Sequence, residues 1–220
     1  MNTLTIREYN FKELILDNFK QTHPQKIFKW ADFEESKFKE EIFNTYHKLT
    51  GQKNNPNIKL SPWLIEIEDV VIVLDEILHF NRYRGITLRS EIYNNLPSFP
   101  LSQYTRYCNQ KENECLKPGG SLNNWSNQFA EIQFGPSSQR VGDFKGLGSS
   151  AWKLRAFKDY LQDISSLMTK DYKVLRISVW DQIMNSGQLH SYNDLLLNPS
   201  EADKELIIKN IQRRIKTITS

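Results

Sequence analysis

The chain has few cysteines, no long apolar run and little net charge. Cys108 and Cys115 are its only cysteines, which is too few for a disulfide scaffold, so a reducing cytoplasm is the expected compartment. No apolar run reaches the roughly 18 residues that a membrane span needs, and the first residues resemble neither a signal nor a transit peptide, so no membrane association is expected. A net charge of +3 does not by itself indicate nucleic-acid binding, which must therefore be argued from local clusters.

Several common catalytic and cofactor patterns are also missing. The sequence contains no G-x-S-x-G nucleophile turn, no dinucleotide fingerprint and no GKS or GKT of a P-loop. The two cysteines are spaced C-x6-C without a nearby pair of histidines, which argues against a structural zinc site. These absences leave hydrolytic or binding chemistry based on acids, histidine and basic residues.

What is present predicts a soluble α/β protein. The 220 residues are 39% hydrophobic and 25% charged, which suits one domain with a full core or a domain with a helical extension. Apolar spacing predicts helices over residues 7–20, 33–49, 101–110, 150–168 and 201–215. Runs rich in β-branched and aromatic residues predict strands at 63–67, 70–74, 129–134 and 173–180, although residues 62–80 also fit one long helix. This order predicts a small mixed β-sheet flanked by helices, with an N-terminal helical extension at residues 1–50 and an α/β domain at residues 51–220.

Acids and a histidine follow the predicted strand at residues 70–74. Asp75 and Glu76 end that strand, His79 follows, and Glu66 lies on the preceding predicted strand. If the two strands pair, Glu66 and Asp75 can approach one another and hold Mg²⁺ or Mn²⁺, with Glu76 as a further ligand. His79 then serves as a ligand, a general base or a phosphate contact. The alternative is that the acids cap a hairpin and that His79 makes a hydrogen bond in the core.

Two basic clusters indicate phosphate contacts. The first, after His79, contains Arg82, Arg84 and Arg89, and guanidinium groups match phosphate oxygens well. The second precedes and enters the predicted helix at 150–168 behind a glycine-rich loop, and helix N-termini attract anions. Its basic residues are Arg140, Lys145, Lys153, Arg155 and Lys158. A solvated turn and an ordinary glycine-rich helix cap are the alternatives for the two clusters.

Glu131 and Gln133 form a second candidate site. They lie two residues apart on the predicted strand FAEIQF at residues 129–134, so both would point to one face of the sheet. Some nucleases use E-x-Q in place of E-x-K, which is the reason to consider this pair.

The string VIVLDEILHFNRYRGITL resembles the core of restriction-endonuclease-like, or PD-(D/E)XK, proteins near the very-short-patch-repair type. It also resembles an uncharacterised bacterial family with a DExxHFNRYR motif, to which we assign the matching blocks FPLSQYTRYC, EIQFGP, GDFKGLGSSAWKLRAFKD and RISVWD. Together these blocks span roughly residues 63–181, and the second half is also similar to the RAP module of organellar RNA-handling proteins. The repair-type pattern often has an acid where this chain has Val73. This chain also has no lysine in the E-x-K place, so Glu66 or the pair Glu131 and Gln133 would substitute.

The resemblance implies a restriction-endonuclease-like core and a metal-dependent endonuclease that cleaves DNA in restriction, repair or phage defence. Its implied cofactor is Mg²⁺ or Mn²⁺, and its implied catalytic residues are Asp75, Glu76, His79 and Glu66. The two basic clusters supply the expected nucleic-acid contacts: Arg82, Arg84, Arg140, Lys145, Lys153 and Arg155. The alternatives are a catalytically inactive module of the RAP kind that binds RNA, and an interaction subunit of a defence complex. A homodimer or a larger defence complex is compatible with each of these hypotheses.

Overall fold

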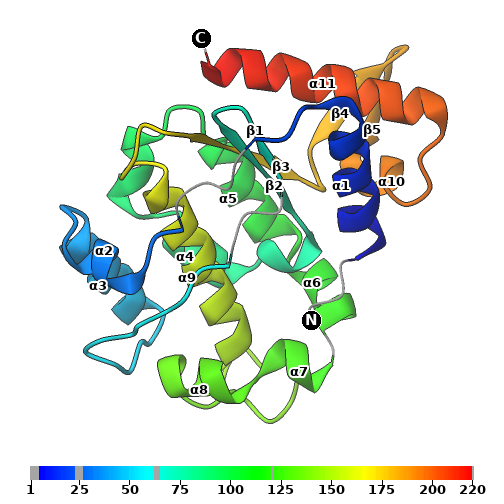
Figure 1. Ribbon diagram of the computed structural model, residues 1–220. Coiled ribbons are helices and arrows are strands. Elements are labelled where there is room, and N and C mark those ends of the chain that lie inside the picture. The colour runs from blue at the N-terminus through cyan, green and yellow to red at the C-terminus, as the bar shows by residue number, and fades with distance from the viewer. Residues whose placement is uncertain (1–4, 23–26, 62–64, 120, 220) are drawn as a thin grey trace. The chain divides into compact units, whose positions relative to one another are not determined.

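The computed structural model describes the chain except for residues 1–4, 23–26, 62–64, 120 and 220 (Figure 1). The chain divides into two compact units. The first, here called the sheet unit, comprises residues 1–26, 62–76 and 170–220, and the second, the helical unit, comprises residues 27–61 and 77–169. The predicted boundary at residue 50 differs from this division, because residues 1–26 and 27–50 fall into different units.

The sheet unit contains a small mixed sheet of three strands. Strand β1 (Glu66–Ile67) pairs antiparallel with β2 (Val70–Asp75), and β2 pairs in parallel with β3 (Lys173–Ser178). A separate hairpin follows, made of β4 (Gln182–Asn185) and β5 (Gln188–Ser191). The predicted α/β class with a small mixed sheet is therefore confirmed, and part of the predicted strand at 63–67 lies outside the described residues.

Three helices complete the sheet unit: α1 (Ile6–Asn18), α10 (Tyr192–Leu195) and α11 (Glu201–Thr219). Helix α1 begins at a capping box, in which the Thr5 hydroxyl accepts from the Glu8 amide and the Glu8 carboxylate accepts from the Thr5 amide. Its apolar stripe packs into a core shared with the sheet and with α11. That core includes Phe11, Leu14, Ile15, Ile67, Val70, Ile72, Leu175, Ile177, Ile207 and Ile211.

Parallel strands need a long crossover connection. Between β2 and β3 this connection runs from Glu76 to Tyr172, and nearly all of it belongs to the helical unit. The end of β2 therefore leads directly into the helical unit, and the segment with Asp75, Glu76 and His79 crosses from one unit to the other.

The helical unit consists of short helices around α9 (Ser150–Ser165), most of whose residues are buried. Helices α3, α4, α7 and α8 all contact α9. The elements of this unit other than α9 are α2 (Trp30–Glu34), α3 (Lys39–Lys48), η1 (Ile77–His79), α4 (Arg82–Thr87), η2 (Glu91–Asn95), α5 (Leu101–Gln110), α6 (Glu112–Gly119), α7 (Leu122–Trp125) and α8 (Gln128–Phe134). No helix in the described part of the chain is long and apolar enough to cross a membrane.

Two predicted elements differ from the structure. Residues 129–134 form helix α8 and not a strand, because Asn127 caps its start and Gly135, at φ 79°, ends it after less than two turns. A segment this short shows too few residues for its period to be recognised in the sequence. The predicted helix at 33–49 is divided into α2 and α3, which are separated by residues 35–38. The other predicted helices are present with small differences at their ends.

Candidate functional site

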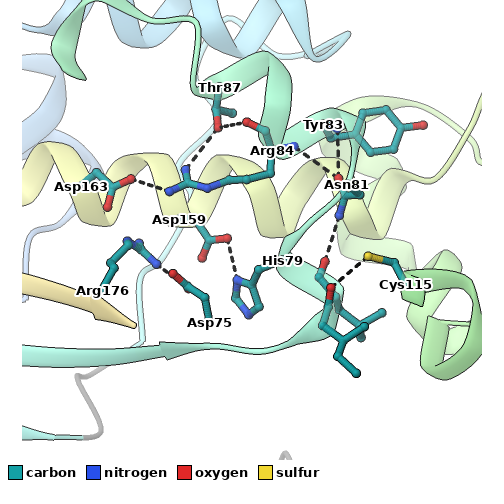
Figure 2. A network of polar contacts seen from close by, with 12 residues as sticks. Asp75, His79, Asn81, Tyr83, Arg84, Thr87, Cys115, Asp159, Asp163 and Arg176 are labelled. Atoms are coloured by element: carbon teal, nitrogen blue, oxygen red, sulfur yellow. Dashed lines mark hydrogen bonds and ion pairs between the residues drawn. The ribbon is translucent and has the colours of Figure 1, made fainter. Parts of the chain in front are cut away.

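The strongest candidate for chemistry in the helical unit is the hydrogen-bonded pair of His79 and Asp159. His79 is the last residue of η1, and Asp159 lies on α9. The His79 Nδ1 atom lies 2.7 Å from Oδ2 of Asp159 (Figure 2). The Asp159 side chain is 6% exposed, whereas the His79 side chain is 21% exposed. The pair thus combines a buried carboxylate with an imidazole that keeps some contact with solvent.

The turn that carries His79 is held by side chains on both sides. The Cys115 thiol shares its single proton between the carbonyl oxygens of Ile77 and Phe80, which lie 2.9 and 3.0 Å from Sγ. Burial raises the pKa of that thiol to about 12. The Asn81 side-chain amide donates to the Leu78 carbonyl, while its oxygen caps the N-terminus of α4 (Figure 2). These contacts fix the backbone around His79, so the orientation of the ring is set by the fold.

A histidine bound at Nδ1 to a carboxylate has a defined tautomer. The carboxylate accepts the Nδ1 proton and orients Nε2, and this arrangement is the one that accompanies metal-ligating histidines and histidine general bases. Asp159 therefore makes His79 suited to either role. Sequence reasoning assigned Asp159 no role in a site.

In the sheet unit, Asp75 ends β2 and is paired with Arg176 on β3. The Arg176 Nη1 atom donates to Asp75 Oδ1 at 2.6 Å, and both side chains are 1% exposed. Arg176 lies opposite Val73 in the parallel register, two positions before the partner of Asp75, so the two side chains share one face of the sheet. The backbone carbonyl of Arg176 accepts from Arg214, whose other nitrogen pairs with Asp181.

Within the helical unit, His79 and Asp159 are among the described side chains that can hold a metal ion. Asp75 precedes His79 by four residues on one continuous segment of the chain. An imidazole ligand fits Mn²⁺ better than Mg²⁺, because imidazole nitrogen favours transition metals. Arg176 already compensates the charge of the Asp75 carboxylate, so this carboxylate has less need of a metal ion.

Residues 44–198 match a family of unknown function, DUF7255. The chain belongs to this family. The matched region contains Asp75, His79, Asp159 and Arg176, and it ends before helix α11. Neither a curated protein nor a solved structure matches the chain.

Two acids predicted to join Asp75 within the DUF7255 region have other positions. Glu66 lies opposite Val71 in the antiparallel register. Four residues separate Val71 from Asp75, about 13 Å along the strand, so the register does not bring Glu66 to Asp75. Glu76 is buried and accepts the hydroxyl proton of Thr5, the N-cap of α1.

Arg82 and Arg84, two of the three arginines of the first basic cluster, have different environments. Arg84 is 1% exposed and donates to Asp163, Tyr93 and Thr87, so it belongs to the core and is not placed to contact a phosphate (Figure 2). Arg82 forms a bidentate ion pair with Glu112 at the surface, in which Nε and Nη2 donate to the two carboxylate oxygens.

The second basic cluster is only partly at the surface. Arg140 and Lys145 are exposed, and Arg155 is half-buried. Lys153 is buried and donates to the Thr50 hydroxyl and to the Leu147 carbonyl, and desolvation lowers its pKa. Of these four predicted nucleic-acid contacts, Arg140 and Lys145 are therefore the accessible ones.

The predicted pairing of Glu131 and Gln133 on one face is wrong. Residues two apart do not share a face of a helix, and both lie on α8. Gln133 is buried and its side-chain oxygen accepts from the Tyr46 hydroxyl, whereas Glu131 is exposed and accepts from the Ser126 hydroxyl.

Sequence reasoning missed Asp163 and Arg176 as parts of the polar core. Each had a signal in the sequence. Arg176 stands inside the apolar strand KVLRIS, where a charged side chain requires a buried partner. Asp163 lies four residues after Asp159 on α9, so both carboxylates point to the same side of a largely buried helix.

Proposed function

We propose that the protein is a metal-dependent nuclease that hydrolyses phosphodiester bonds in DNA, with His79 as a metal ligand through Nε2 and Asp159 as the carboxylate that orients its ring. The observation that carries the proposal is the pairing of His79 with Asp159, a partly exposed imidazole fixed by a buried carboxylate. The resemblance of the segment from Asp75 to His79 to a nuclease motif supports the same assignment.

Each residue has a defined task in this proposal. Asp159 fixes the ring of His79, and Arg176 holds the Asp75 carboxylate at the end of β2. A bound divalent ion would lower the pKa of a water molecule and stabilise negative charge on the phosphate. The exposed Arg140 and Lys145 supply positive charge for the nucleic-acid backbone.

The test is cleavage of plasmid DNA with Mn²⁺, with Mg²⁺ and with a chelator. We expect cleavage with Mn²⁺ that exceeds cleavage with Mg²⁺, and loss of cleavage in His79→Ala and Asp159→Asn. His47→Ala is a matched control because His47 is an exposed histidine of the same unit, and it should keep full activity. Cleavage that persists in Asp159→Asn would remove the assignment.

A second readout separates loss of metal from loss of folding. Mn²⁺ that binds the native state raises the melting temperature of the wild-type chain in a concentration-dependent manner. His79→Ala and Asp159→Asn should melt cooperatively yet lose this Mn²⁺-dependent shift. An unchanged shift in both variants would place the metal elsewhere.

The pairing of Asp75 with Arg176 favours a second candidate, a catalytically inactive module that binds nucleic acid, RNA included. The guanidinium already compensates the carboxylate charge, which reduces the need for a metal at that position. Here binding to DNA or RNA should persist in a chelator, weaken as salt rises and never lead to cleavage.

A further inference from the structure

Helix α11 (Figure 1) extends from Glu201 to Thr219. Three exposed basic residues lie between its middle and its C-terminus: Lys209, Arg213 and Lys216. We name these three residues the basic stripe. They are spaced four and three residues apart, so they lie on one face of the helix. No acidic residue occurs between residues 206 and 219. The nearest acid along α11 is Glu205, which pairs with Lys209.

The face opposite the basic stripe is the face that packs. Ile207 and Ile211 are fully buried in the core of the sheet unit. At about 100° per residue, these two positions lie roughly opposite Lys209 and Arg213. The core therefore fixes how α11 is rotated, and the stripe is directed away from the core.

Arg214 shows how the fold uses a basic residue for structure. It reaches back to the sheet, where it pairs with Asp181 at 2.7 Å and donates to the carbonyl of Arg176 at 2.6 Å. Lys209, by contrast, has an exposed ion pair with Glu205 at 3.3 Å, in which the two side chains are 74% and 71% exposed. Exposed pairs of this kind contribute little to stability, so fold stability does not account for Lys209.

Stabilisation of the helix dipole does not account for the basic stripe either. Basic residues are favourable near a helix C-terminus only within about the last turn. Lys216 lies in that turn, whereas Arg213 and Lys209 precede it. Lys173 already donates to the carbonyl of Ile218 at that end of the helix.

We propose that the basic stripe binds the phosphate backbone of duplex DNA. The distance from Lys209 to Lys216 along the helix axis is about 10 Å. One DNA strand has a phosphate about every 3.4 Å of axis, so the stripe matches about three phosphates. The inference rests on the proposed function for the choice of DNA as the polyanion, and it adds a docking surface on an element that takes no part in the metal group.

The test measures the anisotropy of a fluorescent DNA duplex in a chelator over a series of salt concentrations. The variant replaces Lys209, Arg213 and Lys216 with Gln. We expect affinity to fall at least tenfold at low salt, and the slope of log affinity against log salt to decrease by up to about 2.7, since each phosphate contact contributes about 0.9.

The control variant replaces Lys37, Lys39 and Lys48 with Gln, which removes the same charge from exposed positions at and beside helix α3. It should bind DNA as the wild type does. Equal losses in the two variants would show that only net charge matters and would overturn the inference. Binding to phosphatidylserine vesicles without binding to the duplex would overturn it as well.

Cleavage with Mn²⁺, measured on the same proteins, separates this inference from the proposed function. If the stripe variant loses DNA affinity and the wild type does not cleave, the basic stripe stands and the nuclease proposal fails. If the wild type cleaves DNA and the stripe variant binds and cleaves equally well, the nuclease proposal stands and the basic stripe fails.

Discussion

Replacement of Arg84 by methionine should destabilise the protein strongly. The Arg84 guanidinium is buried and bonds to Asp163 at 2.7 Å, to Tyr93 at 3.0 Å and to Thr87 at 3.2 Å. The variant leaves the carboxylate of Asp163, whose side chain is 2% exposed, without the guanidinium that compensates its charge. Breaking a buried ion pair by removal of one partner costs about 3–5 kcal/mol. This is a large fraction of the roughly 5–15 kcal/mol that stabilises a typical domain.

Arg82→Met is the matched control, because Arg82 lies two residues earlier on the same helix and also pairs with an acid. Its partner Glu112 lies near the surface, and the Arg82 side chain is 46% exposed. Such a pair contributes about 0.2–1 kcal/mol. The stacking of Arg82 over the Phe144 ring at 3.9 Å adds about 0.5–1 kcal/mol. We therefore expect Arg82→Met to cost no more than about half of what Arg84→Met costs.

The assay is urea unfolding followed by tryptophan fluorescence, with free energies extrapolated to zero denaturant. A third variant, Arg84→Met with Asp163→Leu, removes both partners and should recover most of the stability that Arg84→Met loses. Equal costs for Arg82→Met and Arg84→Met would refute the argument, because burial would then have no effect. Failure of the double variant to recover would show that the cost lies in lost packing and not in the uncompensated charge.

Two further predictions concern the packing around the site. Gly148→Ala should destabilise the protein by about 2–4 kcal/mol, because Gly148 has φ +71° and a Cβ there would overlap the Tyr83 hydroxyl. In a Tyr83→Phe background the loss of unfolding free energy should be smaller. An equal loss in both backgrounds would contradict the overlap. The raised pKa of Cys115 contributes stability that is fully present below the ordinary value of 9.0 and is lost as pH rises toward about 12. From this group, unfolding free energies should therefore begin to fall near pH 9, with a slope that approaches about 1.4 kcal/mol per pH unit above about pH 10. Cys115→Ala should remove that slope, whereas Cys108→Ala should not.

Much of the fold was predictable from the sequence because long periodic segments determine it. Helices α1, α9 and α11 have apolar stripes that extend over several turns, and β2 is an unbroken run of β-branched residues and leucine before Asp75. Helix α8 was mistaken for a strand because seven residues are too few to distinguish a period of two from one of 3.6.

The candidate site was predicted in part. His79 and Asp75 were recognised because acids and a histidine after an apolar strand are unusual in sequence. Asp159 and Arg176 were not, because each is about 80 to 100 residues from its partner in the chain. Such pairings depend on tertiary structure, which a single sequence without related sequences does not reveal. Arg84 was assigned to the surface for the same reason, since its buried partner Asp163 is 79 residues away.

The position of Asp75 determines how far the nuclease proposal can extend. Its carboxylate is bound by Arg176 with both side chains buried, and a metal at this carboxylate competes with a guanidinium that the fold already holds in place. His79 and Asp159 are not subject to this competition, because their pairing orients a ring nitrogen that a metal can use. Metal affinity in this chain should therefore depend more on His79 and Asp159 than on Asp75. A nuclease that instead depended on Asp75 above all would need Arg176 to release that carboxylate when the metal binds.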